Sequence, residues 1–258
     1  MKRAALFLIA GLLALPSAVQ AHLVNSGLGP FYDGSLHLLL SPVDLPGLIA
    51  IALLAGLCGP KTGRLVTMSL PACWLLAGLI GMQLPAMIDT PWLTMLAFVA
   101  FGLLVAADIR LPPAAVAILG GLYGLLQGLQ NGSALASIGA DMTALFGIVM
   151  TSLVIVLLIA AAVNLIHASW ARILIRVGGS WLVAVGVMML AWLFAGLTRR
   201  RIRRLQQITA PSRFSHLAPG LASSRPGLRL AVWFTGISLL VVSLARPQWG
   251  EQLEEVRR

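Results

Sequence analysis

The chain has 258 residues, of which 59% are hydrophobic and 10% charged, and its formal net charge at pH 7 is +10. The mean hydropathy of +0.94 excludes an ordinary soluble domain, because the apolar residues come in runs about long enough to cross a hydrocarbon core of roughly 30 Å. Eleven of the eighteen basic residues lie from Arg199 onward, without an aromatic-laced basic groove, so the charge does not indicate nucleic-acid binding. Membrane orientation and contact with anionic lipids explain it better.

The first 21 residues have the pattern of a secretory signal peptide. Lys2 and Arg3 form a basic start, residues 4–15 form an apolar core, and Ala21 closes a small-residue cleavage site. Cleavage would make His22 the mature N-terminus, outside the cytoplasmic membrane. The alternative is that this segment is an uncleaved first helix.

Seven candidate membrane spans follow the signal, and the loops between the first six are short. The spans cover residues 43–59, 65–83, 91–108, 112–129, 141–167, 174–197 and 228–245. Small residues within them would let helices approach closely. They include Gly120, Gly121, Gly124, Gly128, Gly178 and Gly179. We therefore predict an all-α, polytopic transmembrane helix bundle with a six-helix core and one extra C-terminal span.

The basic residues in the loops predict the orientation of the bundle. With residue 22 outside, the loops that carry Lys or Arg fall on the cytoplasmic side, and loops 84–90 and 130–140, which carry neither, fall outside. Six spans would then place the basic cluster Arg199–Arg204 outside, which the same rule disfavours. Either one span is re-entrant, or the segment beyond about residue 198 is a separate module.

The composition changes at this point of the chain. Residues 199–228 are polar and basic, with prolines and serines typical of a juxtamembrane linker. The predicted organisation is a signal peptide at 1–21, a transmembrane bundle at 22–198, a basic linker at 199–228, and an extra span with its tail at 229–258.

Ionisable residues gather just behind the signal, where residues 22–44 hold two of the four histidines and two of the eight acidic residues. Ionisable groups beside membrane spans are the best candidates for chemistry or transport. Asp33 and His37 would share a helix face, and Asp44 would fall within roughly 40° of both. One imidazole and two carboxylates suit nickel, cobalt or zinc, and His22 would add an imidazole and a free amine. We predict a metal site formed by His22, Asp33, His37 and Asp44.

Each member of this set has an alternative interpretation. The sequence from Ser41 to Asp44 is typical of a helix start in which Ser41 is the cap, and such a cap would break a helix that ran from Asp33 to Asp44. Asp33 and Gly34 together form a turn signal. His37 could be an interfacial histidine that bonds to the backbone.

Two polar residues of the fourth span, Gln127 and Asn131, could line a transport path or make hydrogen bonds between helices. Cys58 and Cys73 do not form a metal-type pair and are expected to be packed thiols. The chain has no Walker loop, nucleophile elbow or zinc-protease motif. The sequence therefore predicts neither an enzyme nor a permanently bound cofactor.

Several segments resemble the HupE/UreJ family of membrane proteins over about residues 1–198. The resemblance is carried by residues 21–24, 27–34, 37, 41–45, 53–57, 70–75 and 179–182, and it is most specific at residues 29–34. It implies a nickel or cobalt permease of the bacterial inner membrane, or an accessory protein of hydrogenase or urease maturation. His22, Asp33, His37 and Asp44 are the matching polar positions, and nickel or cobalt would be the substrate.

The C-terminal part resembles a different protein class. Residues 229–251 look like the membrane-proximal part of Bat-type proteins, in which a von Willebrand A domain follows. This resemblance implies a fusion of two genes or a truncated product, with a Bat-type partner. The main alternative to a permease is a non-transporting membrane scaffold or assembly protein.

Overall fold

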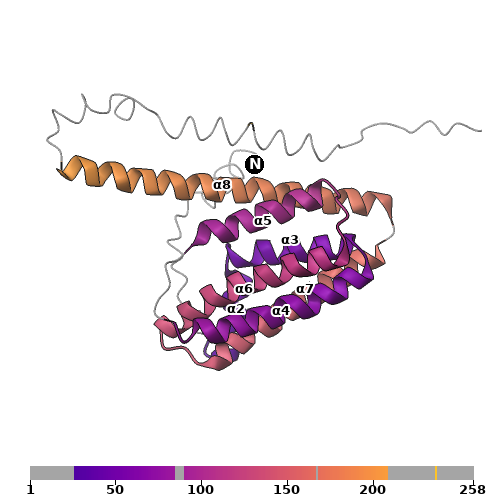
Figure 1. Cartoon of the computed structure of the whole chain (residues 1–258), viewed down its shortest axis with the longest axis horizontal. Helices are drawn as coiled ribbons and strands as arrows, with labels where there is room; N and C mark the ends of the chain where they lie inside the picture. Colours follow the sequence, from indigo (N-terminus) through magenta and orange to yellow (C-terminus); the bar gives the residue numbers. More distant parts are fainter. Residues whose placement is uncertain (1–25, 85–89, 167, 209–235, 237–258) are drawn as a thin grey trace, which may run out of the picture.

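The computed structural model describes residues 26–84, 90–166, 168–208 and 236 (Figure 1). This part of the chain forms helices and no strands, which confirms the predicted all-α bundle. The helices are α2 (Pro30–Leu40), α3 (Asp44–Leu57), α4 (Pro60–Gly81), α5 (Pro91–Ala106), α6 (Pro113–Ser137), α7 (Met142–Leu165) and α8 (Ser169–Ile208). The predicted span 228–245 lies outside the described residues, apart from residue 236.

Four helices, α4, α6, α7 and α8, are long and apolar enough to cross a membrane. Helices α2 and α3 together make a fifth candidate, bent by 75° at the break between them. Helix α5 is apolar but has only 16 residues. Helix α3 alone has 14 residues, about 21 Å, so the predicted span at 43–59 is too short without α2.

Local sequence explains where the helices begin. Helices α2, α4, α5 and α6 each have a proline in the first turn, where its missing N–H has no helical partner to lose. Gly29 and Gly59 precede two of these prolines with φ of 108° and 102°, a backbone conformation that side chains rarely adopt. These residues set the start of each helix independently of its neighbours.

Helices α4 and α6 pack backbone against backbone. A Cβ added to any of three glycines spaced four apart on α6 would overlap a carbonyl oxygen of α4. The pairs are Gly124 with Leu70, Gly128 with Trp74, and Gly132 with Gly78. The predicted close approach at the α6 glycines is therefore confirmed. Gly178 differs, because a Cβ there would meet no atom within 4 Å.

Helix α3 is the central element of the bundle. It packs against α4, α5, α6 and α7, and nine of its 14 residues are buried. Helix α2 packs mainly on α7, and α5 packs on α8 at one side of the bundle (Figure 1). A charged residue at the start of α3 is therefore placed in the interior.

Helix α8 continues well beyond the predicted span. Its 40 residues correspond to about 60 Å, roughly twice the hydrocarbon thickness of a bilayer. The helix runs without interruption through Arg199–Arg204 to Ile208, and its C-terminal part projects past the bundle in Figure 1. The predicted boundary between the bundle and the basic linker, at residue 198, therefore does not coincide with the end of a helix.

Three connections, α3–α4, α5–α6 and α7–α8, meet at one end of the bundle, where they line a common cavity. This basic end carries Lys61, Arg64, Arg110, Arg172 and Arg176. The α4–α5 and α6–α7 connections lie at the opposite end and have no Lys or Arg among their described residues. Helix α8 starts at the basic end, and its C-terminal part, which carries Arg199, Arg200 and Arg201, extends past the opposite end (Figure 1). The structure thus places the loops that carry Lys or Arg at one end of the bundle and the loops that carry neither at the other.

Candidate functional site

Asp44 is the first residue of α3 and only 8% of its surface is exposed. The helix begins two residues later than predicted, with Val43 directly before it, but Ser41 still bonds to its first turn. The Ser41 hydroxyl accepts the Asp44 N–H at 3.2 Å, and the Ser41 carbonyl accepts the Leu45 N–H at 3.2 Å. The break between α2 and α3 also means that Asp33, His37 and Asp44 do not lie on one continuous helix. Asp44 is therefore both a helix-start residue and a buried carboxylate.

The Asp44 side chain is held by residues from two other helices. The Gln127 amide of α6 donates to Asp44 Oδ1 at 2.6 Å, and the Thr94 hydroxyl of α5 donates to Gln127 Oε1 at 2.8 Å. The Tyr123 hydroxyl donates to the Asp44 backbone carbonyl at 2.8 Å. Thr94 and Gln127 are fully buried. We call Asp44, Gln127 and Thr94 the interior polar chain.

Further polar side chains continue from this chain toward the opposite end of the bundle. Gln130 Oε1 lies 3.3 Å from the Thr94 hydroxyl, and Gln130 Nε2 donates to the Thr90 hydroxyl at 3.1 Å. A hydroxyl has one proton, so Thr94 donates to either Gln127 or Gln130 at any moment. Gln127 is ten residues from the end of α6, about 15 Å, so it lies near the middle of a helix that is long enough to cross a hydrocarbon core of about 30 Å.

Gln127 and Asn131, the two predicted path residues, have different partners. Gln127 bonds to side chains of α3 and α5, which confirms the interpretation that it joins helices. The Asn131 amide instead donates to the Gln127 carbonyl at 3.0 Å, within its own helix. Asn131 thus lies beside the interior polar chain and does not extend it across helices.

Asp33 belongs to the first turn of α2, so the interpretation of Asp33 and Gly34 as a turn is wrong. Its Oδ1 accepts the Ser26 N–H at 2.7 Å and the Ser26 hydroxyl at 2.5 Å. A carboxylate in the first turn is also stabilised by the helix dipole. His37 lies one turn later, in the last turn of the same helix, and is half-buried.

The predicted four-residue metal site is described only in part. His22 lies outside the described residues. Within the residues that the structure describes, no three His, Cys, Asp or Glu side chains form a group that could hold a metal ion. The site therefore stays a prediction, with Asp33 and His37 on α2 and Asp44 across the break on α3.

Sequence reasoning missed Thr90, Thr94, Tyr123 and Gln130. Gln130 had a detectable signal, because it is a second glutamine three residues after Gln127 and shares a helix face with it. Thr94 had a weaker signal: its hydroxyl is the only polar side-chain group between Trp92 and Ala106 except the indole of Trp92 itself. Its partnership with Gln127 depends on how α5 packs against α6, which no local pattern contains.

The comparison with known families identifies one match. The model of the family described as HupE / UreJ protein matches residues 10–189, more than half of the chain. No curated protein and no solved structure matches the chain. The family is associated with membrane proteins and with nickel and cobalt transport. The matched region includes the broken α2–α3 pair and the whole interior polar chain, and the chain belongs to the HupE / UreJ family.

Proposed function

We propose that this protein is a permease whose substrate is a divalent transition metal ion, nickel or cobalt. The observation that carries the proposal is a buried carboxylate, Asp44, at the break between α2 and α3 and beside Gln127 near the middle of α6. Ionisable residues at this depth are costly and mark ion pathways, and helix breaks next to them are typical of transporter sites.

The groups around the break suit a cation that has lost part of its water. The Asp44 carboxylate supplies the charge, and His37 in the last turn of α2 supplies an imidazole. Gln127 now turns its Nε2 toward Asp44, so its amide would rotate to offer Oε1 to the ion, beside the oxygen of Thr94. Mixed nitrogen and oxygen ligands suit nickel and cobalt. The C-terminal end of α2, where the Leu38 carbonyl accepts the Ser41 N–H at 3.4 Å, precedes the same break, and a cation is favoured at the negative end of a helix dipole.

Capture would take place at the end opposite the basic end. His22, Asp33 and His37 are the proposed capture residues, and Thr90 and Gln130 lead from that end toward Asp44. In this proposal the mature N-terminus lies outside the bacterial inner membrane, after removal of the signal peptide. Metal delivery to a maturing hydrogenase or urease fits the same path, with that metalloenzyme's maturation machinery as the partner.

The C-terminal residues 229–258 lie outside the described part of the chain, except residue 236. Their resemblance to Bat-type proteins supports a second role as an assembly element, with a Bat-type partner. A scaffold of this kind would not need a carboxylate inside the bundle. The buried position of Asp44 therefore favours transport over a scaffold.

Uptake of radioactive nickel and cobalt by cells that produce the protein tests the proposal. Asp44→Asn keeps the shape of the side chain but removes its charge, and we expect uptake to fall by at least about tenfold, as for loss of 1.4 kcal/mol or more of ion stabilisation. The matched control is Asp141→Asn, because Asp141 is exposed and bonds only locally, to the Thr143 hydroxyl at 2.9 Å. The control should keep wild-type uptake.

Two results would contradict the proposal. The first is equal uptake at submicromolar metal by cells with and without the protein. The second is wild-type uptake by Asp44→Asn or by the double variant Asp33→Ala/His37→Ala, at equal amounts of protein in the membrane. Copurification of a stoichiometric partner without metal binding would instead support the scaffold.

A further inference from the structure

A cavity of about 500 Å³ lies at the basic end of the bundle. It is formed where the ends of α3, α5 and α7 meet the start of α8, and its lining includes Cys58, Arg110, Asn164, Ser169 and Arg172. Cavities of roughly 300–1,000 Å³ are typical of small-molecule sites. The cavity is separate from the interior polar chain, since none of Asp44, Gln127 and Thr94 lines it.

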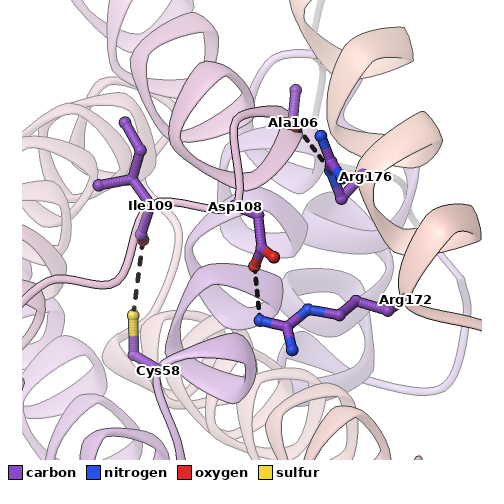
Figure 2. A network of polar contacts seen from close by, with 6 residues as sticks. All are labelled: Cys58, Ala106, Asp108, Ile109, Arg172 and Arg176. Atoms are coloured by element: carbon purple, nitrogen blue, oxygen red, sulfur yellow. Dashed lines mark hydrogen bonds and ion pairs between the residues drawn. The ribbon is translucent and has the colours of Figure 1, made fainter. Parts of the chain in front are cut away.

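Positive charge dominates this end. Arg110 and Arg172 both line the cavity, and Asp108 is the one acidic side chain that the described residues place at the basic end. Figure 2 shows Arg172 reaching from α8 to Asp108, with Nη2 2.9 Å from Oδ1, while Arg176 Nε donates to the Ala106 carbonyl at 3.0 Å. The surplus of guanidinium groups excludes a simple cation site here.

Arg172 is only partly used by its neighbours. Of the five N–H donors of a guanidinium, the contact with Asp108 engages one nitrogen, and Arg172 Nε is buried without a hydrogen-bond partner. The side chain as a whole is still 41% exposed, so part of it is accessible beside the buried Nε. The planar fork of a guanidinium matches the oxygens of a phosphate group, which it binds in a bidentate manner.

The start of α8 adds further donors to the same cavity. Ala168 and Ser169 line it, and the first N–H groups of a helix have no helical partner. A helix start, a serine hydroxyl and two arginines together favour an anion with several oxygens. Basic pockets between membrane helices commonly take lipid headgroups of this kind.

We propose that this cavity binds a phosphate group, supplied either by the headgroup of an anionic phospholipid or by a soluble phosphate. Arg110 and Arg172 bind the phosphate oxygens from two sides, and the start of α8 binds them from a third. The proposed phosphate site is independent of metal transport, because Asp44 does not line the cavity.

The test uses the full-length protein in nanodiscs of zwitterionic phosphatidylcholine. In one arm, inorganic phosphate is added at constant ionic strength, with chloride as the reference, and the thermal unfolding midpoint is followed. In the other arm, the discs also contain phosphatidylglycerol, and the lipid retained by the protein is counted by native mass spectrometry. A saturable rise of the unfolding midpoint in the first arm identifies a soluble phosphate as the ligand. Phosphatidylglycerol retained in the second arm identifies a lipid headgroup. Either result supports the proposal.

Three variants distinguish a phosphate site from general surface charge. Arg110→Gln should weaken binding about tenfold or more, since it removes a charged hydrogen-bond donor from the cavity. Arg64→Gln is the matched control, because Arg64 is an exposed arginine at the same end that does not line the cavity. It should bind like the wild type.

Asp108→Asn should bind phosphate more tightly than the wild type, because it releases Arg172 from its ion pair. Asparagine also tolerates the left-handed backbone of Asp108, whose φ is 54°. If the Arg172–Asp108 ion pair only held the structure together, Asp108→Asn would instead weaken phosphate binding. Three results would overturn the proposal. They are the absence of saturable binding in both arms, an equal loss of phosphate affinity in Arg110→Gln and Arg64→Gln, and binding by Asp108→Asn that is no tighter than in the wild type.

Discussion

At the scale of single residues, Asp44 shows how a carboxylate is kept inside an apolar bundle. Its N–H is capped by Ser41, its carboxylate lies at the positive end of the α3 dipole, and Gln127 donates to Oδ1. These interactions offset part of the desolvation of the charge. Under the proposed function, this carboxylate is the group that a cation would meet inside the bundle.

The two glutamines of α6 allow a direct comparison. Gln127→Leu leaves the buried Asp44 carboxylate without this donor, and we expect a loss of about 1–3 kcal/mol in the free energy of unfolding. Gln130→Leu removes a bond to Thr90 from a half-buried position and should cost less. Thermal unfolding of both variants in detergent measures the difference. Equal destabilisation would mean that Asp44 does not depend on Gln127.

At the scale of elements, the glycines of α6 determine how closely α4 and α6 approach. A Cβ at Gly124, Gly128 or Gly132 would overlap backbone of α4, so the two helices could not keep this distance. This contact fixes the position of Gln127, which lies next to Gly128 on the same helix. The interior polar chain therefore depends on small residues that carry no chemistry themselves.

Gly128→Ala should destabilise the bundle by about 1–3 kcal/mol, because the added methyl group overlaps the Trp74 carbonyl and overpacks the contact. Gly178→Ala is the matched control on α8, where the methyl group meets no atom within 4 Å. The control should be neutral or slightly stabilising, since alanine favours helix over glycine by about 1 kcal/mol. Unfolding midpoints of the two variants give the answer, and a neutral Gly128→Ala would show that α4 and α6 can move apart.

At the scale of the whole molecule, charge divides the bundle into two ends. Basic connections surround the cavity, and the interior polar chain leads toward the end whose described connections carry no Lys or Arg. The arginines Arg199–Arg201 near the end of α8 extend past that second end. Positive loops favour the cytoplasmic side of a membrane. This arrangement predicts metal capture on the outside and release near the basic end.

Accessibility of introduced cysteines tests this orientation. In a variant with Cys58 and Cys73 replaced by serine, a cysteine at the exposed residue Ser137 should react with an impermeant maleimide in intact cells with a permeabilised outer membrane. A cysteine at exposed Lys61, at the basic end, should react only after the inner membrane is opened. The opposite pattern would reverse the orientation and with it the proposed direction of transport.

The sequence by itself determined the helical class, most helix starts and the bond of Ser41 to the first turn of α3. These are local properties, since apolar runs, prolines and capping residues act within a few positions of the chain. It also singled out Asp44 and Gln127, because polar groups are conspicuous in apolar helices. It did not contain the 75° bend between α2 and α3, nor the length of α8.

Only the tertiary structure decided which polar groups meet. Gln127 and Asp44 are 83 positions apart, and Thr94 is 33 positions from Gln127, so their contacts depend on the packing of three helices. The cavity of Arg110 and Arg172 likewise exists only where three connections meet. The physical reason is that hydropathy selects which residues enter a membrane, whereas close packing selects which of them touch.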